Sequence, residues 1–315
     1  MTAYMAAVWI DALRALQPLA RAMGDPSLAS AAAKMCERAL ASVETRLRNP
    51  QDGLLALQLN HDGALNAVTT ALSAVPIALG VETGHAADRT LARLTGPSFA
   101  TPWGVRMLSS SDPRYNPSGY HFGAVWPLFT GWTALACYER GNASDGERLT
   151  KANAAIAWER ARGAFDEVLH GETGNAAGVC PDQAWSAAML VAPVVSGMWG
   201  VRPRDGATRL LVRPQLPHSW DHAMLSNVRV GESRVDLTLS QQPSGRGLTF
   251  TARRQHGTLA ELQVELALGA VRDLRAGGDA ATTVGRRVDE STPWVGWNLS
   301  LANSMATLTV EWSSP

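Results

Sequence analysis

The sequence predicts a mainly α-helical protein that ends in an all-β domain. Hydrophobic residues recur at a helical period up to about residue 200, and at a period of two from about Val201 onward. In the first part, segments rich in Ala, Gly and Trp alternate with segments rich in Arg, Lys and Glu. Helical hairpins arranged in a ring give this alternation, because their inner helices are crowded and their outer helices are solvated.

Seven helices are expected in this first part. Their ranges are about 4–20, 27–48, 66–79, 86–95, 123–140, 147–163 and 182–198. The sequence "GDPS" ends the first helix and begins the second. The first, third, fifth and seventh helices are expected to pack side by side, with the other three outside them.

The second part predicts a small antiparallel β-sandwich. The stretches "NVRVGESRVDLTL", "LTFTARRQHGTLAELQVELAL" and "MATLTVEW" alternate polar and apolar residues and are interrupted by glycine turns. About eight short strands are expected. We place the boundary between the two domains after residue 203, which gives domains of residues 1–203 and 204–315.

Composition excludes several classes of function. The 315 residues carry 28 basic and 28 acidic side chains without a basic stripe, so neither nucleic acid nor an anionic membrane is an expected partner. No apolar run is long enough for a membrane helix. Three widely spaced cysteines without a CxxC pair indicate neither a disulfide framework nor a zinc site, and no metal or cofactor is expected. The N-terminus lacks the features of a signal peptide, which favours a cytoplasmic protein.

A long aromatic loop, "FATPWGVRMLSSSDPRYNPSGYHFGAVWP", leads into the helix expected near Gly123. Long aromatic loops are typical of functional sites, whereas connecting loops are short and polar. Tyr and Trp rings stack on sugar rings, and Arg, Asp, Asn and His bind hydroxyl groups, so this mixture is typical of a sugar site. The alternative is that the aromatic side chains close one end of the helical bundle.

A second loop, "FDEVLHGETGNAAGVCPDQAWSAAML", runs from an outer helix into the last inner helix and carries Glu167 and Glu172. A carboxylate at such a position can activate water for attack on an anomeric carbon. The alternative is that both glutamates are solvated charges at the ends of the loop.

The motifs in these loops resemble the glycogen-debranching (amylo-α-1,6-glucosidase) type of six-hairpin (α/α)6 glycosidase. The segment "GVRMLSSSDPRYNPSGYHFGAVWP" is similar to the family's G-x-R-x-L-S and P-x-Y-x-P-x-x-Y-H-x-G-x-V-W-P patterns. "PDQAWSAAML" resembles its P-Q-A-W-(S/A)-A helix, and "YMAAVWIDALRAL" resembles its A-L-W helix. The resemblance covers about residues 4–220 and implies a partial (α/α)6 toroid.

The resemblance also implies roles for residues. The stretch "EVLHGETG" before "WSAA" is similar to the loop whose first Glu is the catalytic base in processing glucosidases, so the base corresponds to Glu167. Glu172 matches no acidic position of that pattern. His121 and Trp126 correspond to the H-x-G-x-V-W-P motif and are expected sugar contacts. Five further substrate-contact candidates, for which packing is the alternative, are Trp103, Arg106, Tyr120, Gln183 and Trp185. Asp112 is either a sugar ligand or a turn residue.

The family's general acid is an Asp upstream of the A-L-W helix, which here begins near residue 4. The chain therefore resembles the C-terminal part of such an enzyme, and neither Asp11 nor Asp62 is assigned as the acid. An open half-ring is expected to associate with itself or with the missing half. If the gene starts further upstream, the alternative is that the parent protein is exported.

The expected function is inverting hydrolysis of an α-glucoside or oligosaccharide. One alternative is a non-catalytic carbohydrate-binding protein that keeps the aromatic groove. Another is a toroid polysaccharide lyase, in which Tyr and His transfer the protons.

Overall fold

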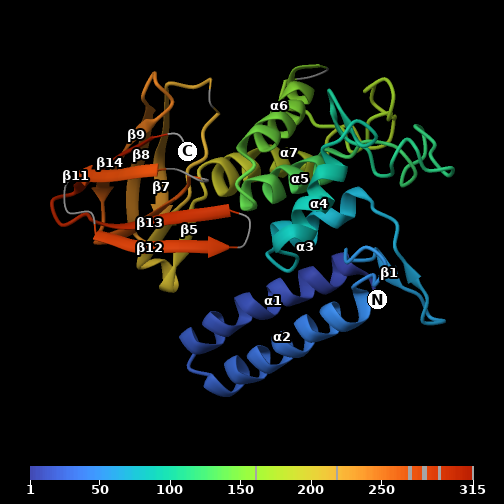
Figure 1. Ribbon diagram of the computed structural model, residues 1–315, viewed down its shortest axis with the longest axis horizontal. Coiled ribbons are helices and arrows are strands. Elements are labelled where there is room, and N and C mark those ends of the chain that lie inside the picture. The colour runs from blue at the N-terminus through green and yellow to red at the C-terminus, as the bar shows by residue number, and fades with distance from the viewer. Residues whose placement is uncertain (160–161, 218, 269–271, 279–281, 290–291, 314–315) are drawn as a thin grey trace. The chain divides into compact units, whose positions relative to one another are not determined.

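The computed structural model describes residues 1–159, 162–217, 219–268, 272–278, 282–289 and 292–313 (Figure 1). The chain forms two compact units, Met1–Val194 and Val195–Pro315. The first unit is helical and the second is built from strands, as the change of hydrophobic period predicts. The roles assigned to residues 1–203 and 204–315 stay predictions.

The described part of the first unit contains seven α-helices, which confirms the expected fold class. They are α1 (Ala3–Ala22), α2 (Pro26–Leu47), α3 (Ala74–Ala78), α4 (Gly84–Leu94), α5 (Pro127–Glu139), α6 (Ala143–Glu159) and α7 (Ala184–Ala192). Between them lie a 3-10 turn, η1 (Ala71–Ser73), and four two-residue strands: β1 (Gln58–Leu59), β2 (Leu65–Asn66), β3 (Ala100–Thr101) and β4 (Gly104–Val105).

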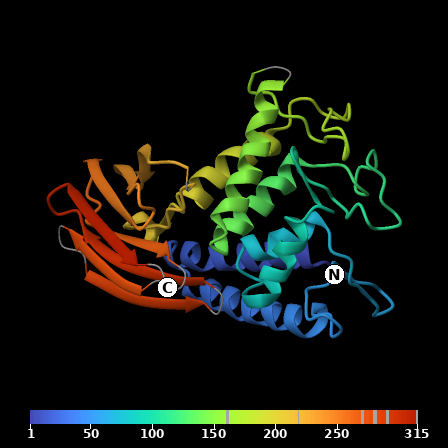
Figure 2. The same ribbon diagram turned by 45° about the horizontal axis from the view of Figure 1, so that its top comes forward.

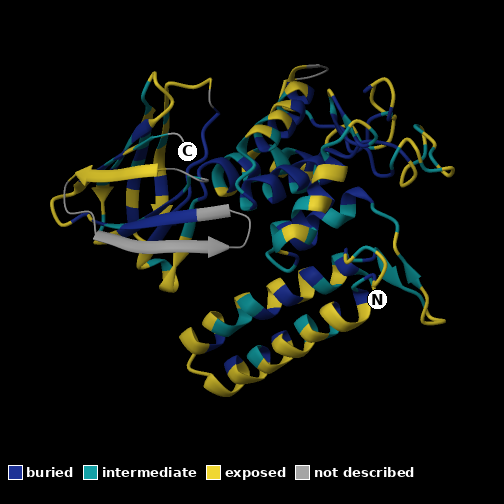
Figure 3. Ribbon diagram, viewed as in Figure 1, coloured by how far each residue is buried: buried dark blue, intermediate teal, exposed yellow. Residues whose placement is uncertain are grey.

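The odd-numbered helices are neighbours, as expected for inner helices. The helix α3 contacts both α1 and α5, and α5 also contacts α7. The helices α1 and α2 form one hairpin and α5 and α6 another, and the α1–α2 pair lies side by side in both views (Figures 1 and 2). Outer α4 buries one face, made by Ala87, Thr90, Leu91 and Leu94. Figure 3 shows the contrast between buried α5 and the exposed face of α2.

Three helices begin or end away from the expected residues. The third starts at Ala71, because Thr70 has extended backbone and the preceding residues belong to β2 and a loop. The fifth starts at Pro127, because Val125 is paired with two neighbouring segments. The last α-helix stops at Pro193, which has no N–H to donate, and a π-helical turn, Pro193–Met198, follows. Residues 160 and 161 of the expected helix 147–163 lie outside the described residues.

The second unit holds two five-stranded sheets. One has the order β12 (Thr282–Asp289), β13 (Thr292–Ser300), β10 (Glu261–Ala267), β6 (Arg209–Val212) and β5 (Arg202–Arg204). The other has the order β11 (Arg272–Gly278), β14 (Met305–Ser313), β9 (Gly247–His256), β8 (Ser233–Gln241) and β7 (His222–Val230). A short 3-10 turn, η3 (Asp205–Ala207), joins β5 to β6.

Strand number and direction differ in part from the expectation. The described residues form ten strands rather than about eight, and β6 pairs in parallel with β10, whereas the other pairs are antiparallel. Alternation along β8 buries Ser233, Val235, Leu237 and Leu239 on one face, which is the periodicity that predicted the sheet.

Candidate active site

Four short segments of the two loops that precede α5 and α7 pair side by side. Antiparallel bridges join Arg106 to Val125, Val125 to Leu169, and Leu169 to Ala176. The Val125 N–H donates to the Leu169 carbonyl at 2.9 Å, and the Leu169 N–H donates back at 2.8 Å. This pairing brings the long aromatic loop against the glutamate-bearing loop, although the two are far apart in sequence.

Trp126 stands at the start of α5. Its backbone is extended (φ −106°, ψ 119°) and Pro127 occupies the first helical turn, where a proline loses no hydrogen bond. The indole Nε1–H donates to the Tyr120 carbonyl at 2.8 Å. The Thr130 hydroxyl donates to the Trp126 carbonyl and accepts the Val105 N–H, both at 3.0 Å. These bonds fix the buried indole ring relative to the preceding loop.

Four aromatic side chains meet at this point. The His121 ring stacks on Trp126, with ring centroids 5.4 Å apart and an interplanar angle of 16°. Tyr120 meets Trp126 edge-on at 4.4 Å, and Trp185, near the start of α7, lies 6.1 Å from Trp126. Trp126 is buried, whereas Tyr120, His121 and Trp185 are exposed. A buried ring therefore supports three aromatic groups that face solvent.

Glu167 joins this group through Tyr120. Glu167 is 7% exposed, and its Oε1 accepts a hydrogen bond from the Tyr120 hydroxyl at 2.9 Å. The Glu167 N–H donates to the Cys180 carbonyl at 2.8 Å, which fixes the backbone on the other side. Partial desolvation of the phenol, and then its hydrogen bond to the Glu167 carboxylate, raise the pKa of Tyr120 above its usual value, so the phenol stays protonated and able to donate. We call Tyr120, His121, Trp126, Glu167 and Trp185 the Trp126 cluster.

Arg106, an expected substrate contact with packing as the alternative, belongs to the aromatic loop and contacts both loops. Its side chain is 10% exposed. The guanidinium Nε–H is shared between the Tyr115 hydroxyl and the Gly171 carbonyl, each at 3.1 Å, and Nη2 reaches Glu172 at 3.3 Å. The Tyr115 hydroxyl donates to the same glutamate oxygen at 2.5 Å. The Tyr115 hydrogen bond and the Arg106 charge hold the pKa of Glu172 below its usual value.

Trp103 and Gln183 lie near the Trp126 cluster but have different surroundings. The Trp103 ring packs on Gly174, whose φ of +71° and whose lack of a Cβ both suit this contact. Trp103 also borders the hydrophobic group of Val125, Ile156, Ala157, Phe165 and Leu169. Gln183 precedes α7, and its N–H donates to the Phe165 carbonyl at 2.8 Å.

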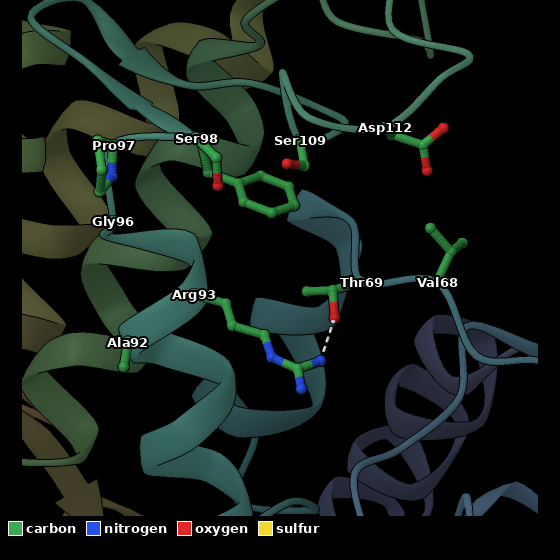
Figure 4. A pocket seen from close by; sticks show the side chains of 10 residues that line it. Val68, Thr69, Ala92, Arg93, Gly96, Pro97, Ser98, Ser109 and Asp112 are labelled. Atoms are coloured by element: carbon green, nitrogen blue, oxygen red, sulfur yellow. Dashed lines mark hydrogen bonds between the residues drawn. The ribbon is translucent and has the colours of Figure 1, made fainter. Parts of the chain in front are cut away.

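Asp112 has a different environment from the Trp126 cluster. Both its carboxylate oxygens accept hydrogen bonds from Arg114, at 2.9 and 2.8 Å, which lowers the pKa of Asp112 to about 2. It lines a cavity of about 390 Å³ opposite Arg93, which donates to Thr69 (Figure 4). None of the other predicted site residues lines this cavity. The turn interpretation of Asp112 thus agrees with its bonds to Arg114.

The structure offers no candidate metal site within the residues that it describes, because no three His, Cys, Asp or Glu side chains gather there. The three cysteines are free, and burial raises the pKa of the Cys137 thiol. No described helix is both long enough and apolar enough to cross a bilayer.

The structure therefore brings five of the nine predicted site residues into one cluster, and their roles in binding and catalysis stay predictions. Sequence reasoning did not single out Tyr115, and it set Glu172 aside. The motifs do not predict the hydrogen bond between Tyr115 and Glu172, because these residues are 57 positions apart in sequence and only the fold brings them together.

Comparisons with solved structures show which folds the chain resembles. A structure described as a sialidase aligns with a TM-score of 0.65 and 18% identity, over 75% of this chain and 23% of that one. The GH63 mannosylglycerate hydrolase from Thermus thermophilus, in complex with glucose, gives a TM-score of 0.50 at 22% identity, over 61% and 47% of the two chains. The GH78 rhamnosidase of Bacillus sp. GL1 gives a TM-score of 0.50 at 17% identity, over 80% and 23%.

At these identities the similarity shows the fold alone. The chain spans less than half the length of each of these proteins. No curated protein sequence matches the chain.

The family is shown by the sequence itself. Residues 1–186 match the mannosylglycerate hydrolase MGH1-like glycoside hydrolase domain, and this range contains the whole Trp126 cluster. The match supports a glycosidase of the (α/α)6 type, and the narrower glycogen-debranching type stays a prediction. The chain belongs to the family of MGH1-like glycoside hydrolase domains.

Proposed function

We propose that this chain supplies the catalytic base and part of the sugar site of an inverting glycoside hydrolase. One observation carries the proposal: the buried Glu167 accepts a hydrogen bond from Tyr120, whose ring belongs to a group of aromatic side chains of which three are exposed. Glu167 is the base, and the rings of the Trp126 cluster form the sugar platform.

The geometry suits a base that activates water. The Tyr120 hydroxyl occupies Oε1 of Glu167, and the described residues donate no hydrogen bond to Oε2. A water bound at Oε2 can therefore transfer its proton to the carboxylate as it attacks the anomeric carbon. The hydrogen bond from Tyr120 holds the carboxylate in one orientation, which is the main requirement for positioned proton transfer.

The substrate that we propose is an α-glucoside or an oligosaccharide, as in glycogen-debranching and processing glucosidases. The resemblance of the loop motifs supports it. The name of the matched family makes mannosylglycerate the second compound to test. Flat exposed rings at His121 and Trp185 suit the apolar face of a sugar, which both substrate types share.

We also propose that the general acid comes from outside these residues. An inverting site needs a second carboxyl group roughly 6.5–9.5 Å from the base, on the other side of the scissile bond. A ring of six hairpins has twelve helices, and the described residues contain seven α-helices. The length of the mannosylglycerate hydrolase, of which this chain covers 47%, supports a further ring segment as the source.

Glycosyl fluorides test the base separately from the acid, because fluoride leaves with little need for protonation. We expect this chain to turn over an α-glucosyl or α-mannosyl fluoride but not the natural glycoside. Glu167→Gln should reduce fluoride turnover on the order of 100- to 10,000-fold. The matched control is Glu37→Gln, which makes the same change on the exposed face of α2 and should leave the rate unchanged.

Each other outcome has a definite meaning. Efficient hydrolysis of the natural glycoside would place the acid within these residues, and Asp112 would be tested first. Sugar binding without any turnover favours a carbohydrate-binding protein, and an unsaturated product that absorbs ultraviolet light favours a lyase. Fluoride turnover that survives Glu167→Gln contradicts the base assignment.

A second part of the proposal concerns a partner for α1. Met5, Val8, Ala12, Ala15 and Leu19 recur at intervals of three and four residues on the exposed side of this helix, with Met5 59% and Leu19 60% exposed. We call these residues the α1 stripe. An apolar stripe with this spacing is typical of a helix–helix contact. We propose that helices of the missing ring segment cover it, in the way that α3 covers the other flank of α1.

Coexpression tests this partner. The chain should copurify with the ring segment encoded upstream, and Leu19→Glu should abolish copurification while leaving the helical circular dichroism unchanged. Arg21→Glu, a charge change at an exposed position outside the stripe, is the control. A stable homodimer that Leu19→Glu dissociates would instead identify a second copy as the occupant.

A further inference from the structure

Besides their backbone pairing, two tyrosine–glutamate hydrogen bonds join the two loops of the candidate site. One is the hydrogen bond from Tyr120 to Glu167, and the other is the hydrogen bond from Tyr115 to Glu172. Tyr115 lies five residues before Tyr120, and Glu172 lies five residues after Glu167. We propose that Arg106, Tyr115 and Glu172 form a clasp that positions the aromatic loop against the loop of the base. This inference rests on the proposed function of Glu167.

The bonds of Arg106 show how the clasp is built. Its guanidinium contacts both loops at once: Tyr115 on the first, and the Gly171 carbonyl and Glu172 on the second. Nη1 also reaches the Pro97 carbonyl at 3.4 Å, near the beginning of the aromatic loop. Because every nitrogen of this guanidinium has a protein partner, Arg106 is a positioning residue and not the sugar contact that its sequence position indicates.

Beside the clasp, the backbones of the two loops are in direct contact. The Gly171 N–H donates to the Pro117 carbonyl at 2.9 Å. A Cβ at Gly171 would lie 2.3 Å from the Gly123 carbonyl oxygen, and a Cβ at Gly123 would lie 2.5 Å from the Tyr115 ring. The two glycines therefore allow the loops to touch through their backbones, and the clasp closes over that contact.

Glu172 has a geometric role in this arrangement. Its side chain is 48% exposed, yet one oxygen accepts from both Tyr115 and Arg106. An ionised carboxylate that receives two donors makes stronger hydrogen bonds than a neutral acceptor. Loss of this attachment removes one of the side-chain links between the loops and leaves the Tyr120–Glu167 bond, the Arg106–Gly171 bond and the backbone pairing.

Amide hydrogen exchange measures the clasp without any need for catalysis. In Tyr115→Phe, which removes one hydroxyl, we expect amides in residues 115–123 and 167–174 to exchange about 10-fold faster, while those in α2 keep their rates. Tyr4→Phe removes a hydroxyl in α1 and is the matched control. Cleavage by trypsin after Arg114, on the exposed loop, should accelerate in the same variant.

Two substitutions of Glu172 separate positioning from loss of folding. Gln keeps an oxygen that accepts from Tyr115 but lacks the charge, so Glu172→Gln should accelerate exchange less than Glu172→Ala does. Unchanged exchange in both Tyr115→Phe and Glu172→Ala would overturn the inference. Acceleration spread over α2 as well would show a general structural role, which also overturns it.

Turnover distinguishes failure of the clasp from failure of the proposed function. On a glycosyl fluoride, Tyr115→Phe should lower kcat several-fold with little change in KM, because the base is misplaced while the sugar platform remains. A rise in KM alone would make these residues substrate contacts. If Glu167→Gln leaves turnover unchanged, the proposed base is wrong, and the exchange result still decides whether the clasp joins the loops.

Discussion

The helices α1 and α5 occupy equivalent inner positions, yet they differ in burial. In α5, nine of the 13 residues are buried, including Phe129, Gly131 and Tyr138. In α1, five of the 20 residues are buried, and the α1 stripe is exposed. Both helices carry apolar residues around much of their surface. The sequence of α1 is therefore that of a helix covered on two sides, although α2 and α3 of this unit cover one side.

The difference comes from neighbours rather than from composition. The helix α5 lies between α3 and α7, and it approaches α7 so closely that a Cβ at Gly131 would lie 2.4 Å from the Met189 Cβ. Asn153 of α6 adds to this contact, since its amide donates to the Pro127 carbonyl at 2.9 Å and to the Met189 carbonyl at 3.0 Å. Among the described residues of the unit, no helix packs in this way on the face of α1 that carries the α1 stripe.

The largest expected difference in stability between the two helices follows from replacing one aromatic side chain on each by Ala. Phe129→Ala should lower the free energy of unfolding by about 3–5 kcal/mol, because a buried aromatic group is lost and a cavity remains. Trp9→Ala, on the exposed side of α1, should change it by less than about 0.5 kcal/mol. Urea unfolding followed by helical circular dichroism measures both. Similar losses in the two variants would show that the exposed side of α1 is covered in solution.

An intermediate effect is expected where side-chain volume is added. Gly131→Ala should lower the free energy of unfolding by about 1–3 kcal/mol through the clash with Met189, although the same change in an open helix stabilises. Ala15→Leu, on the α1 stripe, should be neutral within about 0.5 kcal/mol. Thermal unfolding of the two variants checks the sign. A stabilised Gly131→Ala would contradict the close approach of α5 and α7.

The smallest expected effect compares the two faces of α1 itself. Ile10→Val removes one methylene group from a fully buried side chain and should cost about 0.5–1.5 kcal/mol. Val8→Ala removes two methyl groups from a side chain that is 38% exposed and should cost less than about 0.5 kcal/mol. The measurement is made at two protein concentrations. A cost for Val8→Ala that appears only at the higher concentration would reveal association through the stripe.

Much of the fold could be predicted because it depends on local period. The helical spacing of Tyr4, Val8 and Leu13 predicted α1 within two residues at either end, and the alternation in "SRVDLTL" predicted β8. The sequence predicts the start of α5 four residues early, at Gly123, because Val125 is paired with two other segments and Trp126 has extended backbone. Local propensity cannot anticipate that competition.

The candidate site was likewise predictable only in part. His121, Trp126, Glu167 and Trp185 could be selected from the sequence because motifs mark them one by one. Arg106 was selected for the same reason, yet its guanidinium is occupied by the two loops. Tyr115 lies in the P-x-Y-x-P part of the same motif, but the motif indicated no role for it, since its hydroxyl matters only through Glu172.

The sequence by itself determined which segments are helices and strands, since hydrophobic period and turn residues act over a few neighbouring positions. It also determined the identity of the proposed base, through a motif of contiguous residues. Only the tertiary structure decided which side chains meet, that α5 is enclosed while α1 is not, and that Arg106 joins two loops. Those outcomes depend on contacts between segments some 60 residues apart, which packing and hydrogen bonding select and local pattern does not encode.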